Sequence, residues 1–136
     1  MKKLLLIFLF MAMSCDGSKK SSDVEVRTNK TEFFRESDIV VTIENTSDHT
    51  IAISACENQS DIYYDREKLT ANGWEYWTQL NCLTTLVPLE IGPGASITDT
   101  INVAKAGTYR FRFPYIHDQD SSTLTMVYSN EFSTYQ

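Results

Sequence analysis

The most reactive side chains in this sequence are the thiols of three cysteines, Cys15, Cys56 and Cys82. A cysteine can carry a lipid, pair in a disulfide, bind a soft metal ion or act as a redox thiol. Metal and redox sites are disfavoured because no two cysteines have the C-x-x-C spacing and both histidines, His49 and His117, are isolated in the sequence. We therefore predict no metal ion and no cofactor. Because the number of cysteines is odd, at least one of them cannot pair within the chain.

Acidic side chains occur in two places where they could do chemistry. Asp118 and Asp120 could offer oxygens to Ca²⁺, but this ion takes about six to eight ligands and the rest of an EF-hand pattern is missing. Asp61, Asp65 and Glu67 could supply a general acid and base, but carboxylates along an exposed strand usually keep a surface soluble. The sequence also lacks the G-x-S-x-G motif of a nucleophilic serine. We expect a solvated loop, a solubilising strand and no catalytic residue, and hence no enzyme.

The first fifteen residues have the pattern of a secretory address. Lys2 and Lys3 precede an apolar run, Leu4–Met13, of about ten residues, whereas a helix needs roughly 20 to span a bilayer. The end of this segment, Ala12-Met13-Ser14-Cys15, resembles the lipobox of bacterial lipoproteins, in which the cysteine is lipidated on its sulfur and becomes the mature N-terminus. Ala12 stands where that family usually has leucine. The resemblance implies a signal peptide over residues 1–14 and a lipid anchor on Cys15.

Two other interpretations of this segment stay open. An ordinary signal peptidase could cut before Cys15 and leave a thiol, or the segment could be a short uncleaved anchor. With lipidation, residues 15–23 form the anchor and a flexible polar spacer, and residues 24–136 form the domain. The chain then belongs to the cell envelope. Asp16 resembles an inner-membrane retention signal of enteric bacteria, but Bacteroidetes, which favour short signals, do not follow that rule. The outer membrane is favoured, and the leaflet stays undecided.

The charge of the chain argues against a nucleic-acid partner. Loss of residues 1–14 would remove two lysines and no acid, and would change the formal net charge from −6 to −8. An acidic domain is a poor match to a phosphate backbone.

Lipidation of Cys15 would leave Cys56 and Cys82 as an even pair in an oxidising compartment. A bridge between them would close a loop of about 26 residues, which the chain-entropy model values at about 3.5 kcal/mol. We predict a structural disulfide. The alternatives, a metal pair or a redox dithiol, lack a nearby histidine or third cysteine.

Alternating apolar and polar residues predict short strands, and no window shows a comparable helical stripe. The alternation is clearest in these segments: Ile39–Ile43, Ile51–Ala55, Ile97–Val103, Tyr109–Phe113 and Leu124–Tyr128. Asn72-Gly73, between Ile62–Leu69 and Trp74–Leu80, predicts a hairpin with a type I′ turn. Strands at this spacing indicate one two-sheet domain of seven to nine strands.

The segment Ala106-Gly107-Thr108-Tyr109-Arg110-Phe111 looks like the start of strand F in immunoglobulin-like domains. Together with Ile39–Ser47 and the Pro-Gly turn before Ser96, it resembles bacterial immunoglobulin-like domains over roughly residues 24–135. The resemblance implies an all-β, immunoglobulin-like antiparallel β-sandwich. It also implies that the Tyr109 hydroxyl bonds the preceding turn, and that Phe111 fills the place of the second core cysteine of antibodies.

Aromatic residues gather around the predicted hairpin. Alternation would place Trp74 and Tyr76 on one face and Trp77 on the other. One face is expected to pack a tryptophan into the core. The other face could leave Trp77 and Tyr63 outward, as a platform for a sugar ring or a partner side chain.

Together these observations predict a lipid-anchored, non-enzymatic binding or structural module whose partner is an unidentified protein or glycan. One alternative is a protease inhibitor that presents the loop Glu57–Asp61 or Ile116–Thr123. The other is a carbohydrate-binding module that uses the Trp77 side of the hairpin.

Overall fold

The computed structural model describes residues 23–57, 61–77, 82, 84–118 and 120–136. The predicted signal peptide, Cys15 and nearly all of the spacer lie outside these residues. The strands in the described parts are β1 Val24–Thr28, β2 Glu32–Phe34, β3 Asp38–Asn45, β4 Ile51–Cys56, β5 Asp65–Thr70, β6 Gly73–Tyr76, β7 Leu86–Ile91, β8 Ser96–Asn102, β9 Gly107–His117, β10 Asp120–Tyr128 and β11 Phe132–Tyr135. Among the described residues, no helix is long and apolar enough to cross a membrane.

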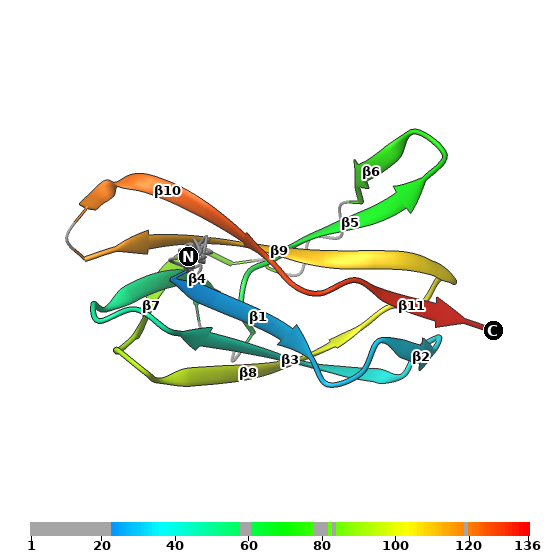
Figure 1. Cartoon of the computed structure of the whole chain (residues 1–136), viewed down its shortest axis with the longest axis horizontal. Helices are drawn as coiled ribbons and strands as arrows, with labels where there is room; N and C mark the ends of the chain where they lie inside the picture. Colours follow the sequence, from blue (N-terminus) through cyan, green and yellow to red (C-terminus); the bar gives the residue numbers. More distant parts are fainter. Residues whose placement is uncertain (1–22, 58–60, 78–81, 83, 119) are drawn as a thin grey trace, which may run out of the picture.

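The strands form two sheets that lie one over the other (Figure 1). The smaller sheet has the order β1-β3-β8, and the larger has the order β2-β11-β9-β4-β7. In the larger sheet, β10 and β5 also pair with β9, and β6 pairs with β5. Among the described strands, all pairs are antiparallel except β11 with β2. The chain passes repeatedly from one sheet to the other, as in immunoglobulin domains. The predicted fold class, an all-β immunoglobulin-like sandwich, is confirmed.

Eleven strands are described where seven to nine were expected, because three long strands of the larger sheet are interrupted. Both β4 and β5 pair with β9, β4 near His117 and β5 between Arg112 and Tyr109. Both β10 and β11 also pair with β9, and β7 and β6 lie beside β4 and β5. Counted as positions in the sheets, the eleven strands therefore occupy eight.

The core lies between the sheets and follows the predicted alternation. Tyr109, Phe111 and Phe113 of β9 are fully buried, and the Phe111 ring lies 4.8 Å from that of Phe132. The opposing sheet contributes Ile39, Val41 and Ile43 of β3. The expectation of a core tryptophan is wrong. The β5–β6 hairpin that carries Trp74 projects away from the sandwich at the upper right of Figure 1, and among the described residues neither tryptophan belongs to the buried core cluster.

The predicted hydrogen bond of Tyr109 is present. Its hydroxyl donates to the Lys105 carbonyl at 3.0 Å, and burial raises the pKa of the phenol. Gly107 has a φ of +154°, and an added Cβ would lie 2.8 Å from Cε of Lys68 and 3.3 Å from the Tyr109 ring. The end of the Lys68 side chain can move aside, but a φ of this sign and size strains any residue with a side chain, so the backbone of this corner favours glycine.

The predicted hairpin is confirmed, but its predicted type I′ turn is wrong. That turn needs a positive φ at two central residues, here Ala71 and Asn72, and among the described non-glycine residues only Glu36 has one. Gly73 alone takes a positive φ, +107°, at the end of the turn. The Thr70 hydroxyl accepts from the Asn72 N–H at 3.1 Å and stabilises this alternative.

Candidate functional site

The side of the larger sheet that faces away from the core carries an unusual set of side chains, which we call the outer face. Cross-strand register and alternation assign these residues to it: Ala52 and Ser54 of β4, Asp65, Glu67 and Leu69 of β5, Trp74 and Tyr76 of β6, Leu86, Pro88 and Glu90 of β7, Arg110, Arg112, Pro114 and Ile116 of β9, and Leu124, Met126 and Tyr128 of β10. One half of this surface is charged and aromatic, and the other half is apolar.

The charged half is held together by two arginine–carboxylate pairs between β9 and β5. Arg112 donates from Nη2 to Asp65 Oδ2 at 2.6 Å, and Arg110 donates from Nε to Glu67 Oε2 at 2.7 Å. We call these four residues the ladder. The expectation that Asp65 and Glu67 are exposed, solubilising acids is wrong, because each is only 8% exposed and lies opposite an arginine.

Aromatic rings cover the ladder. The Arg110 guanidinium lies 4.4 Å from the ring centroid of Trp74 and 4.3 Å from that of Tyr128, and therefore lies between rings from β6 and β10. Arg112 lies 5.5 Å from the ring centroid of Tyr76. Cations at these distances are attracted by the π-system of the ring. The ladder thus links four neighbouring strands through their side chains.

Asp65 is the most heavily bonded member of the ladder. Its Oδ1 accepts from Tyr76 at 2.6 Å and from Tyr63 at 3.2 Å, while Oδ2 accepts two bonds from Arg112. Burial by itself raises the pKa of Asp65, but the bonds from Tyr76 and Arg112 outweigh it and hold the pKa below its ordinary value. A carboxylate with four donors has its acceptor sites filled, so Asp65 is poorly suited to abstract a proton or to bind a sugar hydroxyl.

The structure separates the two residues that were expected to form a binding platform. Tyr63 lies with Asp65 at the ladder, and burial, followed by the charge of Asp65, raises the pKa of its phenol. Trp77 belongs to the other side of the hairpin, where its ring lies 5.1 Å from Nζ of Lys68 and 5.0 Å from Nζ of Lys105. Trp74 and Tyr76, by contrast, share a face as predicted.

The apolar half of the outer face contains a groove of about 290 Å³, lined in part by Ser54, Pro88, Ile116 and Leu124. Nine large apolar side chains are well exposed in the described part of the chain, and six of them belong to the outer face: Leu69, Tyr76, Leu86, Leu124, Met126 and Tyr128. In an antiparallel sheet with one face on the core, the side chains on the face toward water are normally polar. A concentration of this kind is typical of an interaction surface.

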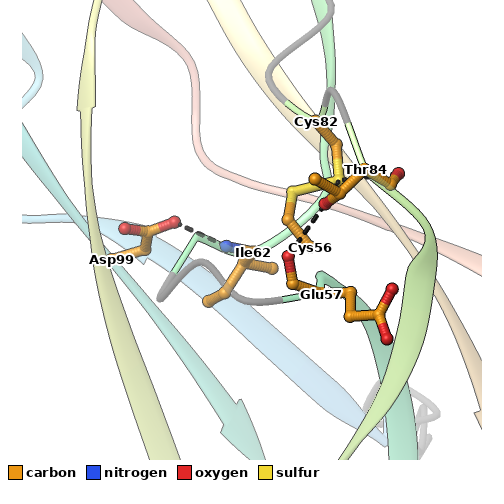
Figure 2. The surroundings of a disulfide bond; sticks show 6 residues. All are labelled: Cys56, Glu57, Ile62, Cys82, Thr84 and Asp99. Atoms are coloured by element: carbon orange, nitrogen blue, oxygen red, sulfur yellow. Dashed lines mark hydrogen bonds between the residues drawn. A yellow bond between two sulfur atoms is a disulfide. The ribbon is translucent and has the colours of Figure 1, made fainter.

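A disulfide joins Cys56 and Cys82, as predicted, with their Cα atoms 5.5 Å apart (Figure 2). Cys56 ends β4, and Cys82 belongs to the connection from β6 to β7, so the bridge joins the interruption between β4 and β5 to the one between β6 and β7. Beside it, the Thr84 hydroxyl donates to the Glu57 carbonyl at 2.9 Å, and Asp99 of β8 accepts from the Ile62 N–H at 2.9 Å. These contacts position the segment that leads into the ladder.

The other candidate residues lie apart from the outer face or outside the described residues. Asp120 accepts from the hydroxyls of Ser122 and Thr123, each at 2.6 Å, and these bonds hold its pKa below the ordinary value. Within the described residues, no group of three histidine, cysteine or acidic side chains could hold a metal ion. Of the loops considered for protease inhibition, residues 58–60 and 119 are outside the description.

Sequence reasoning missed Arg110 and Arg112 as site residues. The signal that could have found them is the matching period-two spacing of two arginines in one strand and two acids, Asp65 and Glu67, in another.

No protein-family model matches the sequence, and no curated protein does. Among solved structures, the ASH/PapD-like domain of human CEP192 (PapD-like domain 7) is similar at 10% identity, with a TM-score of 0.43 over 99% of this chain and 97% of that chain. The Pseudomonas fluorescens alkylpurine DNA glycosylase AlkC, bound to DNA containing an abasic site analog, is similar at 10% identity with a TM-score of 0.34. That match covers 85% of this chain and 31% of AlkC. Neither likeness carries an inference about function.

Proposed function

We propose that this chain is a lipid-anchored, non-enzymatic binding module of the bacterial cell envelope, with the outer membrane favoured. Its binding surface is the outer face of the larger sheet. The observation that supports this surface is the gathering there of six of the nine exposed large apolar side chains of the described residues. The lipobox-like segment ending in Cys15 supports the anchor.

The ladder favours binding over catalysis. Asp65 accepts a bond from the exposed Tyr76 and Glu67 lies opposite Tyr76 in register, but both carboxylates are bonded to arginines from β9. A general acid or base must exchange a proton with a substrate, whereas both of these carboxylates are buried and bonded to arginine side chains. The ladder therefore stiffens a surface and supplies no reacting group.

The same saturation favours a protein over a glycan as partner. Sugar recognition needs polar groups that can bond to hydroxyls in addition to an aromatic surface. On the outer face the Asp65 acceptors are already used, and the apolar half offers Leu86, Leu124 and Met126. Apolar and aromatic side chains with internally paired charges are typical of the centre of a protein interface.

The anchor is tested by Cys15→Ser in the full chain, followed by separation of membrane and soluble fractions. We expect the wild type in the membrane fraction and the variant in the soluble fraction, since lipid chains contribute about 0.8 kcal/mol for each buried CH₂. Ser18→Ala in the spacer is the matched control and should stay with the membrane. Retention of Cys15→Ser in the membrane would show that lipid on this cysteine is not the anchor.

The binding surface is tested by a photo-reactive amino acid placed at Leu124, which is 60% exposed on β10. Thr98, an exposed residue on the polar side of the smaller sheet, is the control position. After irradiation of intact cells, Leu124 should give protein adducts and Thr98 should not. Equal labelling from both positions would mean that the outer face is not the binding surface.

A further inference from the structure

We propose that the partner of the outer face is a second copy of this chain, so that two sandwiches pair through their larger sheets. This inference rests on the proposed binding function and names the partner for that surface. It is supported by the charge balance of the face and by its size.

The charges at the centre of the outer face cancel. Each arginine of the ladder is paired with an acid, at 2.6 Å for both Arg110–Glu67 and Arg112–Asp65. The remaining charged member, Glu90, lies at the β7 edge. The chain as a whole has a formal net charge of −6, so random contacts between copies are repulsive. A face whose central charges cancel lets two such molecules meet with less of that penalty, and its centre lacks the excess charge that would select a charged partner.

The size of the outer face fits a dimer of this kind. On β9 the outer face runs from Arg110 to Ile116, and these seven residues at about 3.3 Å each span roughly 23 Å. Four strand positions, those of β10, β9, β4/β5 and β7/β6, at about 4.8 Å each give a width of roughly 19 Å. The product, roughly 440 Å² for each copy, corresponds to the small interfaces of under ~1,200 Å² in total that form weak, reversible complexes. A two-fold axis would bring the same surface of both copies together, which is the commonest arrangement of soluble oligomers.

Membrane anchoring would favour this pairing further. Two chains tethered to one bilayer share a thin layer of volume, so their effective concentration is higher than in solution. The polar segment between Cys15 and the first strand gives each domain reach to turn its larger sheet toward a neighbour.

The test uses intact cells that express the full chain with two different epitope tags and a photo-reactive residue at Leu124. We expect an adduct of about twice the mass of one chain that carries both tags. The same probe at Thr98 should give no such adduct. Adducts of Leu124 with other proteins alone would overturn the second copy as partner while leaving the binding function in place. Labelling from Leu124 that does not exceed labelling from Thr98 would overturn both.

A second measurement uses two variants of equal charge, Leu124→Lys and Thr98→Lys, each in a full chain that also carries Cys15→Ser. Sedimentation velocity should show dimers for the Thr98→Lys protein. Leu124→Lys should raise the dissociation constant by about tenfold or more, since it places a lysine on the apolar half of the proposed interface. The proposal would be overturned if the Cys15→Ser protein sedimented as a monomer without a further substitution. It would also be overturned if Leu124→Lys and Thr98→Lys gave the same dissociation constant. If Cys15→Ser remains membrane-bound, the anchor assignment fails and the two-tag adduct still reports on pairing.

Discussion

The two outer surfaces of this sandwich follow opposite rules. On the smaller sheet, β3 and β8 present Thr42, Glu44, Thr98 and Thr100 on the face away from the core, and Thr42 lies opposite Thr98 in register. The larger sheet presents leucine, methionine, tryptophan and tyrosine at the equivalent positions. Each sheet already buries one apolar face, so the fold accounts for the polar outer surface of the smaller sheet but not for the apolar outer surface of the larger one. The exposed apolar and aromatic side chains of the larger sheet therefore indicate a functional surface.

Each surface also carries arginine–carboxylate pairs, and these differ in burial. The Arg27 and Glu44 side chains on the smaller sheet are 59% and 35% exposed, whereas those of Arg112 and Asp65 are 25% and 9% exposed. Water weakens the electrostatic attraction within the exposed pair, whereas the buried pair interacts in an environment of lower dielectric constant. An arginine–carboxylate pair is therefore expected to contribute little to stability on the smaller sheet and more on the larger sheet.

The largest expected effect concerns the disulfide, because it bridges interruptions that only the larger sheet has among the described strands. Cys56→Ser with Cys82→Ser should lower the free energy of unfolding by about 3.5 kcal/mol, the loop-entropy value for this separation. Urea denaturation measures the loss, in a Cys15→Ser background as the control for thiol exchange. Hydrogen exchange should accelerate in β5 and β6 and much less in β1, β3 and β8. Uniform acceleration in both sheets would contradict this assignment.

The next effect compares the two ion pairs directly. Arg112→Ala leaves the buried Asp65 carboxylate without its cationic partner and should cost about 3 kcal/mol of unfolding free energy. Arg27→Ala, the matched control on the smaller sheet, should cost about 0–1 kcal/mol, since its pair is exposed. Equal losses in urea denaturation would show that burial does not distinguish the pairs.

The sequence predicted what depends on local pattern. The alternation of Tyr109, Phe111 and Phe113 places three rings in the core, and the preceding glycine turn accepts the Tyr109 hydroxyl. The count of three cysteines predicts the disulfide, because lipidation of Cys15 would leave Cys56 and Cys82 as an even pair. Each of these depends on a few neighbouring residues or on a count.

The ladder escaped prediction because its pairing is not local. Arg110 and Glu67 are 43 residues apart, and their contact depends on the register of β5 on β9. Asn45 shows the same limit. Its side chain is fully buried and bonds the carbonyls of His49 and Ile91, although Asn45-Thr46-Ser47 looks like an exposed turn. Register and burial of single polar groups are decided by tertiary packing, which propensity does not contain.

The smallest expected effect is the pH dependence contributed by Asp65. Its pKa in the folded protein lies below the ordinary value of 3.8 because bonds from Tyr76 and Arg112 outweigh burial. A carboxylate with a lowered folded pKa adds stability that is complete above the unfolded pKa and is lost as the pH falls through the folded pKa. Asp65→Asn should therefore be less stable than the wild type near pH 7, and the gap should narrow below about pH 4. Urea denaturation across this range measures the gap. Glu44→Gln on the smaller sheet removes a carboxylate but leaves Asp65 intact, and is the matched control. A gap between Asp65→Asn and the wild type that stays constant from pH 7 to pH 2 would mean that the ladder does not hold Asp65 ionised.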